Sequence, residues 1–383
     1  MNQRAYLDYN ATAPLRARVR DAVMEALSLP GNPSSVHAEG RAARAAVEEA
    51  RAKVAALVGA RAEDVVFTSG GTEANALALA ALTGDESWHC YLSAIEHPSV
   101  LSGGRFYPET TTVIPVTPDG VVDLGVLEEN LEKHRPGGWR PLVSLMAANN
   151  ETGAIQPVAE AARIVHDVGG VLHTDAVQVA GRMPVDLGAL GADMLTLSAH
   201  KIGGPKGVGA LVLAEGATVR PLIKGGGQEG RRRAGTENVP GIVGFGVAAE
   251  LAATELSRMA EIAQLRDALE KGVRALAADA VVVSEAAPRL PNTSALAVPG
   301  LKAETLVIGL DLAGIAVSAG SACSSGKVEA SHVLAAMGVA PEIAQSSVRV
   351  SLGFGTTDTD IQMCLSAFSD LITRLKKDAK KAA

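Results

Sequence analysis

The sequence predicts an α/β protein, because short β-rich runs alternate with Ala/Glu/Arg-rich helical runs between about residues 41 and 255. The run EDVVFTS, followed by TEANALALAAL, is typical of a strand, a turn and a helix. Four further apolar runs, PLVSLMA, GVLHTDA, DMLTLSA and GVGALVL, continue the alternation. Residues 253–278 then show a long amphipathic pattern that predicts one helix and a domain boundary. Beyond it, the strand candidates VVVS, TSALAVP, GIAVSAG and SVRVSLG predict a smaller α+β domain.

The composition indicates a folded chain of two domains. At 383 residues the chain is longer than one ordinary domain, and 47% hydrophobic against 20% charged residues can form a large core. We place the large domain at residues 12–255 and the small domain at residues 1–11 and 256–383. The net charge of -7 argues against a nucleic-acid partner and against binding to an anionic membrane.

The cysteines and the N-terminus indicate the compartment. Cys90, Cys323 and Cys364 form no CxxC pair, which argues against a disulfide framework and against a preformed thiolate metal site. The first residues, MNQRAYLDYN, lack the apolar core of a signal peptide. The longest uncharged stretch, near VPGIVGFGVAA, is short and broken by glycine, so it does not predict a membrane span. A soluble, cytoplasmic protein is therefore expected.

Polar residues follow four of the predicted strands at the point where each strand ends. They are Ser69-Gly70-Gly71-Thr72, Asn149-Asn150-Glu151, Asp175, and Ser198-Ala199-His200-Lys201. In open α/β sheets, ligands bind outside the carboxyl ends of the strands. The four segments therefore predict one shared site in the large domain.

Two residues of this group fit a pyridoxal phosphate site. Lys201 directly follows an apolar strand, where desolvation favours a neutral amine able to form a Schiff base; a surface lysine in a turn is the alternative. Asp175 ends a strand whose pattern indicates burial, so its carboxylate needs a partner. The pyridinium nitrogen of the cofactor would supply that partner, while a helix N-cap is the alternative role.

Two glycine-rich segments have different interpretations. TSGGTEAN places two glycines before a helix that starts at Thr72, an arrangement that binds phosphate but also occurs in ordinary capping. No GK[ST] follows, so the segment is not a Walker A loop. GGGQEG, residues 225–230, formally matches G-x-G-x-x-G, but no clear strand precedes it and RRRAGTEN follows. We interpret it as a loop that covers an anionic ligand, across a subunit boundary.

Three further candidates are left open by their local sequence. His97, in SAIEHPSV, could stack on a flat cofactor and move protons, or be a structural histidine. Arg349 alternates with valines in SVRVSLG, so it either reaches solvent or binds a carboxylate bidentately. Cys323, in SAGSACSSGK, is a lone thiol on a pliable segment without a neighbouring histidine, and an incidental surface cysteine is the alternative.

In their order along the chain, these motifs resemble the NifS/IscS-type cysteine desulfurases, which are pyridoxal-phosphate enzymes of aminotransferase class V. The resemblance runs from about residue 6 to 355. It implies the type I fold of pyridoxal-phosphate-dependent transferases, with a mixed, mostly parallel sheet in the large domain and a smaller α+β domain. The motifs that carry it are YLDYNATAP, GNPSSVH, FTSGGTEANALA, EHPSV, NNETGAIQP, HTDAVQ, SAHKIGGPKGVGAL, GGGQEGRRRAGTEN, SAGSACSSGKVEASHVL and SSVRVSLG.

The resemblance also implies roles for the matching residues. Lys201 would hold the cofactor and shuttle protons, Asp175 would pair with the pyridine nitrogen, and His97 would stack on the ring. Gln178 would contact the ring oxygen, and Asn32 and Arg349 would hold the carboxylate of the substrate, L-cysteine. Further cofactor contacts would come from Asn150, Gly71, Thr72, Ser198, His200 and, from the other subunit of a homodimer, Thr236.

Cys323 would be the nucleophile that the resemblance requires. Its thiolate would take the sulfur of the substrate, leaving alanine and a persulfide on the protein. The persulfide must travel to a sulfur-acceptor or iron–sulfur scaffold protein, with a transient contact between Cys323 and an iron–sulfur cluster, so a mobile loop rich in glycine and serine is expected. No resident metal is expected.

The resemblance has two departures and several alternatives. The chain ends about where family members often continue into a segment that docks scaffold proteins, and the arginines 231–233 stand in an unusual order, so neither that docking nor the role of these arginines follows from the sequence. The SSG after the cysteine resembles the NifS/IscS branch more than the SufS branch. The alternatives are another class V aminotransferase or lyase, a selenocysteine lyase, a non-catalytic sulfur-carrier subunit and, on GGGQEG alone, a dehydrogenase. The acceptor and the use of selenocysteine are not specified.

Overall fold

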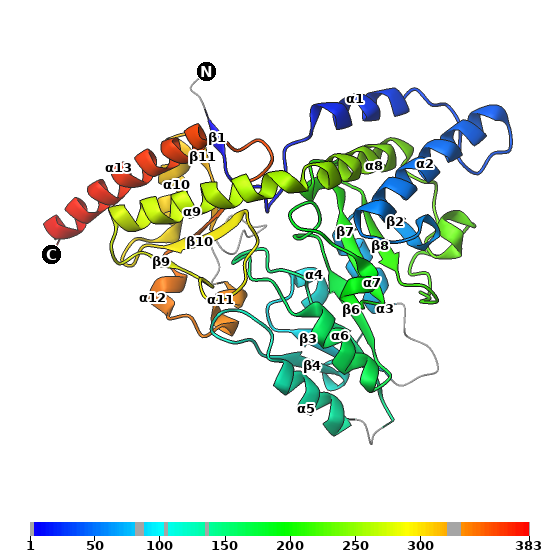
Figure 1. Ribbon diagram of the computed structural model, residues 1–383, viewed down its shortest axis with the longest axis horizontal. Coiled ribbons are helices and arrows are strands. Elements are labelled where there is room, and N and C mark those ends of the chain that lie inside the picture. The colour runs from blue at the N-terminus through cyan, green and yellow to red at the C-terminus, as the bar shows by residue number, and fades with distance from the viewer. Residues whose placement is uncertain (1–3, 81–87, 103–105, 135–137, 320–330, 383) are drawn as a thin grey trace.

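A seven-stranded sheet forms the centre of the computed structural model, which describes residues 4–80, 88–102, 106–134, 138–319 and 331–382 (Figure 1). β8 runs antiparallel to both of its neighbours, and the other adjacent pairs are parallel. The sheet is therefore mixed and mostly parallel, as predicted. Its order is β2 (Val65–Thr68), β8 (Gly209–Leu213), β7 (Met194–Ser198), β6 (Val171–Asp175), β5 (Arg140–Ser144), β3 (Trp88–Ser93) and β4 (Thr111–Ile114).

Helices cover both faces of this sheet because its strands are apolar on both sides. On β8, Ala210 and Val212 pack into one core cluster, whereas Leu211 and Leu213 pack into another on the opposite face. The first cluster includes α1 (Ala17–Ala26), α2 (Ala38–Leu57), α5 (Leu124–His134), α6 (Val158–Asp167), α7 (Leu187–Leu190) and α8 (Val239–Thr254). The second includes α3 (Gly71–Ala80) and α4 (Pro98–Leu101).

A smaller antiparallel sheet lies beside the first. Its order is β12 (Ser318–Ala319), β13 (Ser347–Ser351), β10 (Thr293–Ala297) and β9 (Val281–Val282). The N-terminal β1 (Ala5–Tyr6) pairs in parallel with β11 (Ile315–Ala316). One core cluster joins these strands to α9 (Met259–Leu276), α10 (Ala303–Leu312) and α13 (Asp358–Ala382). The short helices α11 (His332–Ala336) and α12 (Pro341–Ala344) precede β13.

The single helix predicted for residues 253–278 is broken in the structure. α8 ends at Thr254, a 3-10 turn spans Leu256–Arg258, and the segment from Leu256 to Leu276 is bent by 53° from α8. α9 makes up most of the predicted helix, and only the first two residues of the predicted range belong to α8. The two helices pack into different cores, since α8 belongs to the large-sheet cluster and α9 to the small-sheet cluster. Arg16 also binds Glu255 at the break, with 2.6 Å between Nη1 and Oε2. Different packing partners thus override a continuous amphipathic pattern.

Among the described residues, no individual helix combines the length and apolar character needed to cross a bilayer; only α8 together with the bent segment after it meets that test. The division into residues 12–255 and residues 1–11 with 256–383 stays a prediction. It is supported by the packing of Ala5 and Leu7 into the small-sheet core. A fourth cluster joins the two sheets, with Ile95 and Met146 packed against Val283 and Leu334.

Candidate functional site

Four of the predicted cofactor residues line one cavity at the ends of β2 and β7. The cavity has a volume of about 370 Å³ and is lined by Gly71, Thr72, Ser198 and His200 together with Thr12 and Lys206. β2 and β7 both run antiparallel to β8, so their carboxyl ends lie at the same edge of the sheet. Segments more than a hundred residues apart in sequence therefore meet in the predicted site.

The chemistry of this cavity fits a phosphate group. The first N–H groups of a helix have no partner within the helix, and α3 starts at Gly71 on the cavity wall. Gly209 on β8 allows the turn at Gly70, just before α3, to approach closely, because an added Cβ at Gly209 would lie 2.6 Å from the carbonyl carbon of Gly70. Glu73, the acidic residue of this helix start, is bound by Arg233 at 2.8 Å. Hydroxyl, imidazole and ammonium groups thus surround a helix N-terminus whose nearby carboxylate is paired.

Lys201 follows the same strand through a 3-10 turn, Ala199–Lys201. Its Nζ donates to the carbonyl oxygens of Asn10 at 2.6 Å and Ala11 at 2.9 Å. Burial, followed by the charges of Arg182 and Arg349, lowers the pKa of Lys201 to about 7, although Asp175 and Asp8 oppose the shift. At neutral pH a large share of this amine is therefore unprotonated and able to act as a nucleophile.

Asp175 and His97 are joined by a chain of hydrogen bonds. Asn75 Nδ2 donates to Asp175 Oδ2 at 2.8 Å and to Ser99 Oγ at 2.9 Å. Ser99 Oγ in turn lies 2.8 Å from His97 Nδ1, which also accepts from the backbone N–H of Ser99 at 3.1 Å. Because Nδ1 accepts, the neutral imidazole carries its proton on Nε2. Desolvation, together with the charge of Lys201, lowers the pKa of His97 and favours this neutral form.

Asn75 is a site residue that the sequence analysis missed. It is 1% exposed, and its only sequence signal is a polar position on the otherwise apolar helix ANALALA. Replacing it by leucine leaves Asp175 Oδ2 and Ser99 Oγ without their donor. We expect Asn75→Leu to lower the free energy of unfolding by about 1–3 kcal/mol in urea titrations. Asn130→Leu is the control, because among the described residues the Asn130 side chain donates to Val126 of its own helix, α5. Equal losses in the two variants would contradict this role.

Asn10 connects the N-terminal segment to the site. It is 1% exposed, and its carbonyl oxygen accepts from Lys201 and from Gln178 Nε2 at 3.1 Å. Its side chain donates to Thr293 Oγ1 at 2.9 Å and to the carbonyl oxygen of Asn150 at 3.0 Å. Asn10 lies in the YLDYN motif, but nothing in its local sequence indicates a role.

Arg349 lies on the face of β13 opposite the small-sheet core, whereas its neighbours Val348 and Val350 lie within that core. Its Nη2 binds Asp8 Oδ1 at 2.8 Å and its Nη1 donates to the carbonyl oxygen of Asn150 at 3.2 Å. Nε is buried without a hydrogen-bond partner among the described residues. Arg349 therefore does not reach solvent, and among the described residues it binds the Asp8 carboxylate through one nitrogen rather than bidentately, with Nε left over.

Glu151 is a buried carboxyl group behind Arg349. Its Oε2 accepts from the Ser331 hydroxyl at 2.6 Å, and Ser331 caps α11. Burial raises the pKa of Glu151 to about 7, while the Ser331 bond and the charge of Arg349 oppose the shift. Through this hydrogen bond, Glu151, in the turn that follows β5, contacts Ser331 at the start of α11.

The raised pKa of Glu151 predicts a pH-dependent stability. A carboxyl group whose folded pKa is higher than its unfolded value stabilises the fold below the unfolded pKa, and this contribution is lost as the pH rises to about 7. Glu151→Gln removes the dependence. We expect the free energy of unfolding of the variant, relative to the unchanged chain, to rise by up to about 3 kcal/mol between pH 4 and pH 7. Urea titrations across this range check it, and a constant difference would contradict it.

The GGGQEG loop is anchored by a buried ion pair. Glu229 binds Arg51 through both carboxylate oxygens at 2.6 and 2.8 Å and accepts from the backbone N–H of Phe67. Arg232 donates to the carbonyl oxygen of Glu63, and Arg233 pairs with Glu73. Arg231 is exposed and has a left-handed φ of 67°. Two of the three arginines thus hold the loop on the large sheet.

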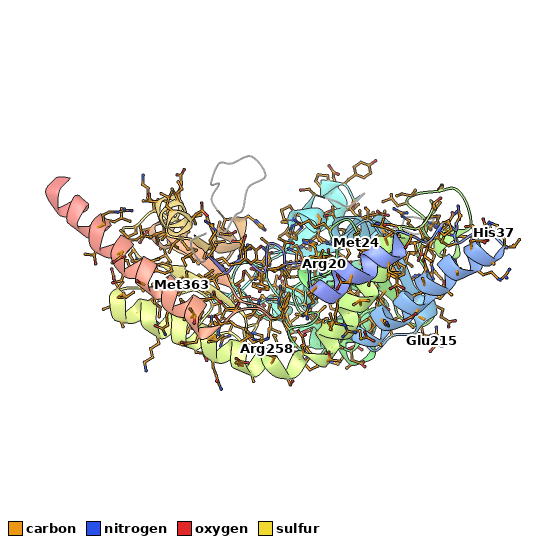
Figure 2. The ribbon with its side chains drawn as sticks, turned by 90° about the horizontal axis from the view of Figure 1, so that it is seen from above. Arg20, Met24, His37, Glu215, Arg258 and Met363 are labelled. Carbon is orange, nitrogen blue, oxygen red and sulfur yellow. The ribbon has the colours of Figure 1, made fainter. Side chains whose placement is uncertain are left out.

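Three predicted residues are not joined to this site within the described chain. Asn32 is exposed in the loop before α2, where its Oδ1 accepts from the Ser34 backbone N–H, and it lines no cavity with Lys201. Figure 2 shows His37, at the start of α2, at the opposite end of the molecule from Met363 on α13. Thr236 is exposed. Cys323 lies outside the described residues, so the roles of all three stay predictions.

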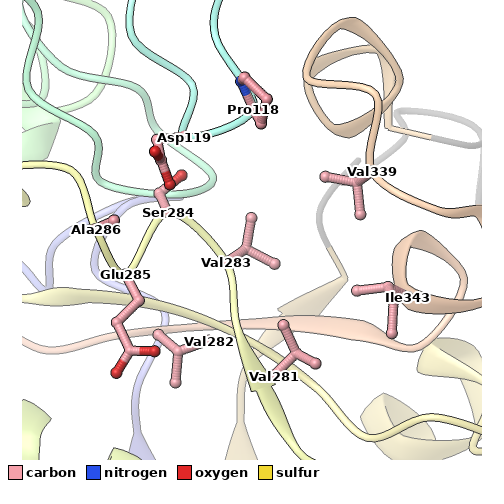
Figure 3. A pocket seen from close by; sticks show the side chains of 10 residues that line it. All are labelled: Pro118, Asp119, Val281, Val282, Val283, Ser284, Glu285, Ala286, Val339 and Ile343. Atoms are coloured by element: carbon pink, nitrogen blue, oxygen red, sulfur yellow. The ribbon is translucent and has the colours of Figure 1, made fainter.

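A second cavity of similar size lies away from these residues. It measures about 350 Å³ and lies between the chain around β9, the Pro118–Asp119 turn and α12 (Figure 3). Its walls are mainly the side chains of Val281, Val283, Val339 and Ile343. Among the described residues, no amine, imidazole or thiol lines it, so we expect the chemistry at the cavity at Gly71.

Comparisons with known proteins agree with this geometry. The family model described as aminotransferase class-V matches residues 5–364. "Cysteine desulfurase IscS" of Dictyoglomus turgidum is 41% identical over 98% of this chain and 96% of its own length, and "Cysteine desulfurase" of Cereibacter sphaeroides is 44% identical over 98% and 97%. The crystal structure of a NifS-like protein from Rickettsia africae is 38% identical, with a TM-score of 0.88 over 97% of this chain and all of that one. The chain therefore belongs to the class V aminotransferase family and, within it, to the NifS/IscS-type cysteine desulfurases.

Proposed function

We propose that this chain is a pyridoxal-phosphate-dependent cysteine desulfurase, which converts L-cysteine to L-alanine and leaves the sulfur as a persulfide on Cys323. The observation that carries the proposal is the Lys201 amine, which donates to two backbone carbonyl oxygens directly after His200 of the Gly71 cavity, in a chain of this family. Lys201, Asp175 and His97 would form the cofactor site, and their presence supports an enzyme over a non-catalytic carrier. The GGGQEG segment, held by Arg51, gives no support to a dehydrogenase.

Two groups of described residues would hold the two parts of the cofactor. Gly71, Thr72, Ser198 and His200 would hold the phosphate, while Asp175 and His97 would hold the pyridine ring and Gln178 its ring oxygen. When bound, pyridoxal phosphate supplies an electron sink for the bonds around the substrate α-carbon. Asn75 fixes the Asp175 carboxylate through Oδ2, and the backbone N–H of Val177 fixes Oδ1 at 3.0 Å.

The substrate would be oriented by Arg349 and deprotonated by Lys201. Arg349 has a buried Nε without a partner, which a substrate carboxylate oxygen would fill. Lys201, with a pKa of about 7, can both accept and return a proton near neutral pH. His97 presents an Nε2–H group, from which it would donate a proton or a hydrogen bond. Asn32 and Asn150 would complete the carboxylate and cofactor contacts.

The transfer of sulfur to Cys323 requires no outside oxidant, because its atoms and electrons are all supplied by the substrate and the thiolate. The Cys323 thiolate attacks the substrate sulfur, an S–S bond forms, and the bond between that sulfur and Cβ breaks. The electron pair of the broken bond stays on the alanine fragment, which takes up one proton. A free cysteine is only a few per cent thiolate at pH 7, so the thiol proton must be removed within the complex. The products are alanine and one persulfide.

We also propose a homodimer in which Thr236 of each subunit contacts the phosphate in the other. Its exposure in the single chain supports this arrangement. Mixing Lys201→Ala chains with Thr236→Ala chains tests it, because the mixed dimer contains one site with both native residues. Activity that recovers on mixing supports the arrangement. Activity that equals the average of the two separate variants would contradict it.

The persulfide would then pass to an acceptor protein, such as an iron–sulfur scaffold, in the cytoplasm. The described thiols, Cys90 and Cys364, are free and buried, which supports a reducing compartment. Burial raises the pKa of Cys364 to about 12, so this thiol stays protonated and cannot compete with Cys323 for sulfur.

The proposed activity is tested by supplying L-cysteine and L-selenocysteine separately and measuring alanine and reduced sulfur or selenium. A desulfurase releases alanine from L-cysteine. Alanine from selenocysteine alone would instead establish a selenocysteine lyase. Transfer of an amino group to an added keto acid, without alanine release, would establish an aminotransferase.

A further inference from the structure

Arg182 is a buried cation without a carboxylate partner among the described residues. Arg182 lies in the segment between β6 and α7 and is only 7% exposed. The two other buried arginines each bind a carboxylate, Arg51 that of Glu229 and Arg349 that of Asp8. Arg182 Nη1 instead donates to the backbone oxygen of Gln178 at 2.5 Å and to its side-chain Oε1. An unpaired buried charge is costly, so its presence beside the site calls for a role.

The contact with Arg182 determines the orientation of the Gln178 amide. A guanidinium group has donors and no acceptor, so the Gln178 atom that faces it must be the oxygen. The amide nitrogen therefore lies on the other side, where one of its hydrogens is donated to the carbonyl oxygen of Asn10 at 3.1 Å. Among the described residues, the second hydrogen of Nε2 has no acceptor and is left for a ligand. Without Arg182, the amide could turn and present an acceptor instead.

The charge of Arg182 also acts on Lys201. Both residues line a small cavity of about 30 Å³ behind the site, together with Tyr9 and Asn292. Burial lowers the pKa of Lys201 most. The charge of Arg182 lowers it further, and the charge of Arg349 adds to this effect. The charges that oppose it are those of Asp175 and Asp8. Burial lowers the pKa of both His97 and His200, and the charge of Lys201 lowers each of them further.

We propose that Arg182 is a positioning residue for pyridoxal phosphate, which holds the Gln178 N–H toward the cofactor ring oxygen and places its guanidinium charge in the cavity that Lys201 also lines. This proposal rests on the proposed cofactor site. It does not make Arg182 a catalytic residue, because the guanidinium acts through Gln178 and through its charge.

The test compares Arg182→Met, Arg182→Lys and the control Arg16→Met. Arg16 lines the same small cavity, but its charge is paired with Glu255 at 2.6 Å. On the full chain freed of cofactor, Lys201 is titrated by the pH dependence of its acylation, mapped by mass spectrometry. Each variant is then given pyridoxal phosphate, and the dissociation constant and the visible absorbance are recorded from pH 6 to pH 10.

In Arg182→Met we expect the acylation midpoint of Lys201 to rise by roughly one pH unit and pyridoxal phosphate to bind about tenfold more weakly. Arg182→Lys keeps the charge, so the midpoint should stay near that of the unchanged chain, while binding is weakened less. Arg16→Met should change neither. Equal effects of Arg16→Met and Arg182→Met, or an unchanged midpoint and affinity in Arg182→Met, would overturn the proposal. If Arg182→Met does not fold, Arg182→Lys provides the test. A Lys201 acylation midpoint in Arg182→Lys that differs from that of the unchanged chain would contradict the proposal.

The same experiment separates this proposal from the proposed function. If the unchanged chain binds no pyridoxal phosphate, the proposed function fails. The acylation midpoint of the cofactor-free chain still measures the effect of Arg182 on Lys201 in that case. If the unchanged chain binds the cofactor and Arg182→Met behaves as Arg16→Met does, only the positioning role fails.

Discussion

Replacing Cys323 by alanine is expected to abolish persulfide formation and to lower alanine production from L-cysteine by at least roughly 100-fold. The reason is that neither of the two described thiols can take the sulfur, since Cys90 is 1% exposed and Cys364 is fully buried. Pyridoxal phosphate should bind the variant with unchanged affinity, because none of the proposed cofactor contacts involves this cysteine. The measurements are alanine release, without added thiol, and the visible spectrum of the bound cofactor.

Cys364→Ala is the matched control for this variant. Its thiol lies in the small-sheet core, where burial raises the pKa to about 12. The control should keep both the persulfide and alanine production, at some cost in stability. If Cys323→Ala still accumulates a protein persulfide, the nucleophile is misassigned.

Replacing Lys201 by methionine is expected to reduce turnover by roughly 10³-fold or more, because the chain loses both its attachment to the cofactor and its general base. The variant should still take up pyridoxal phosphate, more weakly, through the Gly71 cavity and Asp175. Alanine release and the dissociation constant from spectral titration measure the two effects. Lys201→Arg, which keeps a charge but lacks a nucleophilic amine, should be equally inactive.

Lys302→Met provides the control for the lysine variants. Lys302 is exposed before α10, on the small-sheet side of the molecule, and should leave turnover and affinity unchanged. A Lys201→Met enzyme that retains more than about a tenth of normal turnover would contradict the role of Lys201 as both anchor and base.

The large sheet was predictable because each of its main strands is a short apolar run followed by a polar segment. β6 and β7 carry Asp175 and Lys201 at their ends, so their position in an α/β sheet already indicates a site. β4 was not predicted, since TTVI is half threonine and lies at the sheet edge, with no apolar run to reveal it. The break between α8 and α9 was also missed, because it follows from packing against two different cores.

The hydrogen-bond network of the site could not be predicted from sequence. Asn75 and Asp175 are a hundred residues apart, and Arg349 and Asp8 are 341 residues apart. A polar residue on an apolar helix or strand has the same sequence appearance whether it bonds a neighbour or a distant partner. Arg182 is the strongest case, because its lack of a carboxylate partner becomes evident only when every described neighbour is in place.

The most direct test of this account is a single-turnover reaction of the full chain, loaded with pyridoxal phosphate, with L-cysteine in the absence of reductant. Alanine is quantified, and the peptides that carry Cys323, Cys90 and Cys364 are weighed by mass spectrometry. The account predicts the added mass of one sulfur atom on the Cys323 peptide, together with an equal amount of alanine. Alanine without any sulfur adduct on Cys323, or an adduct on another cysteine, would contradict it.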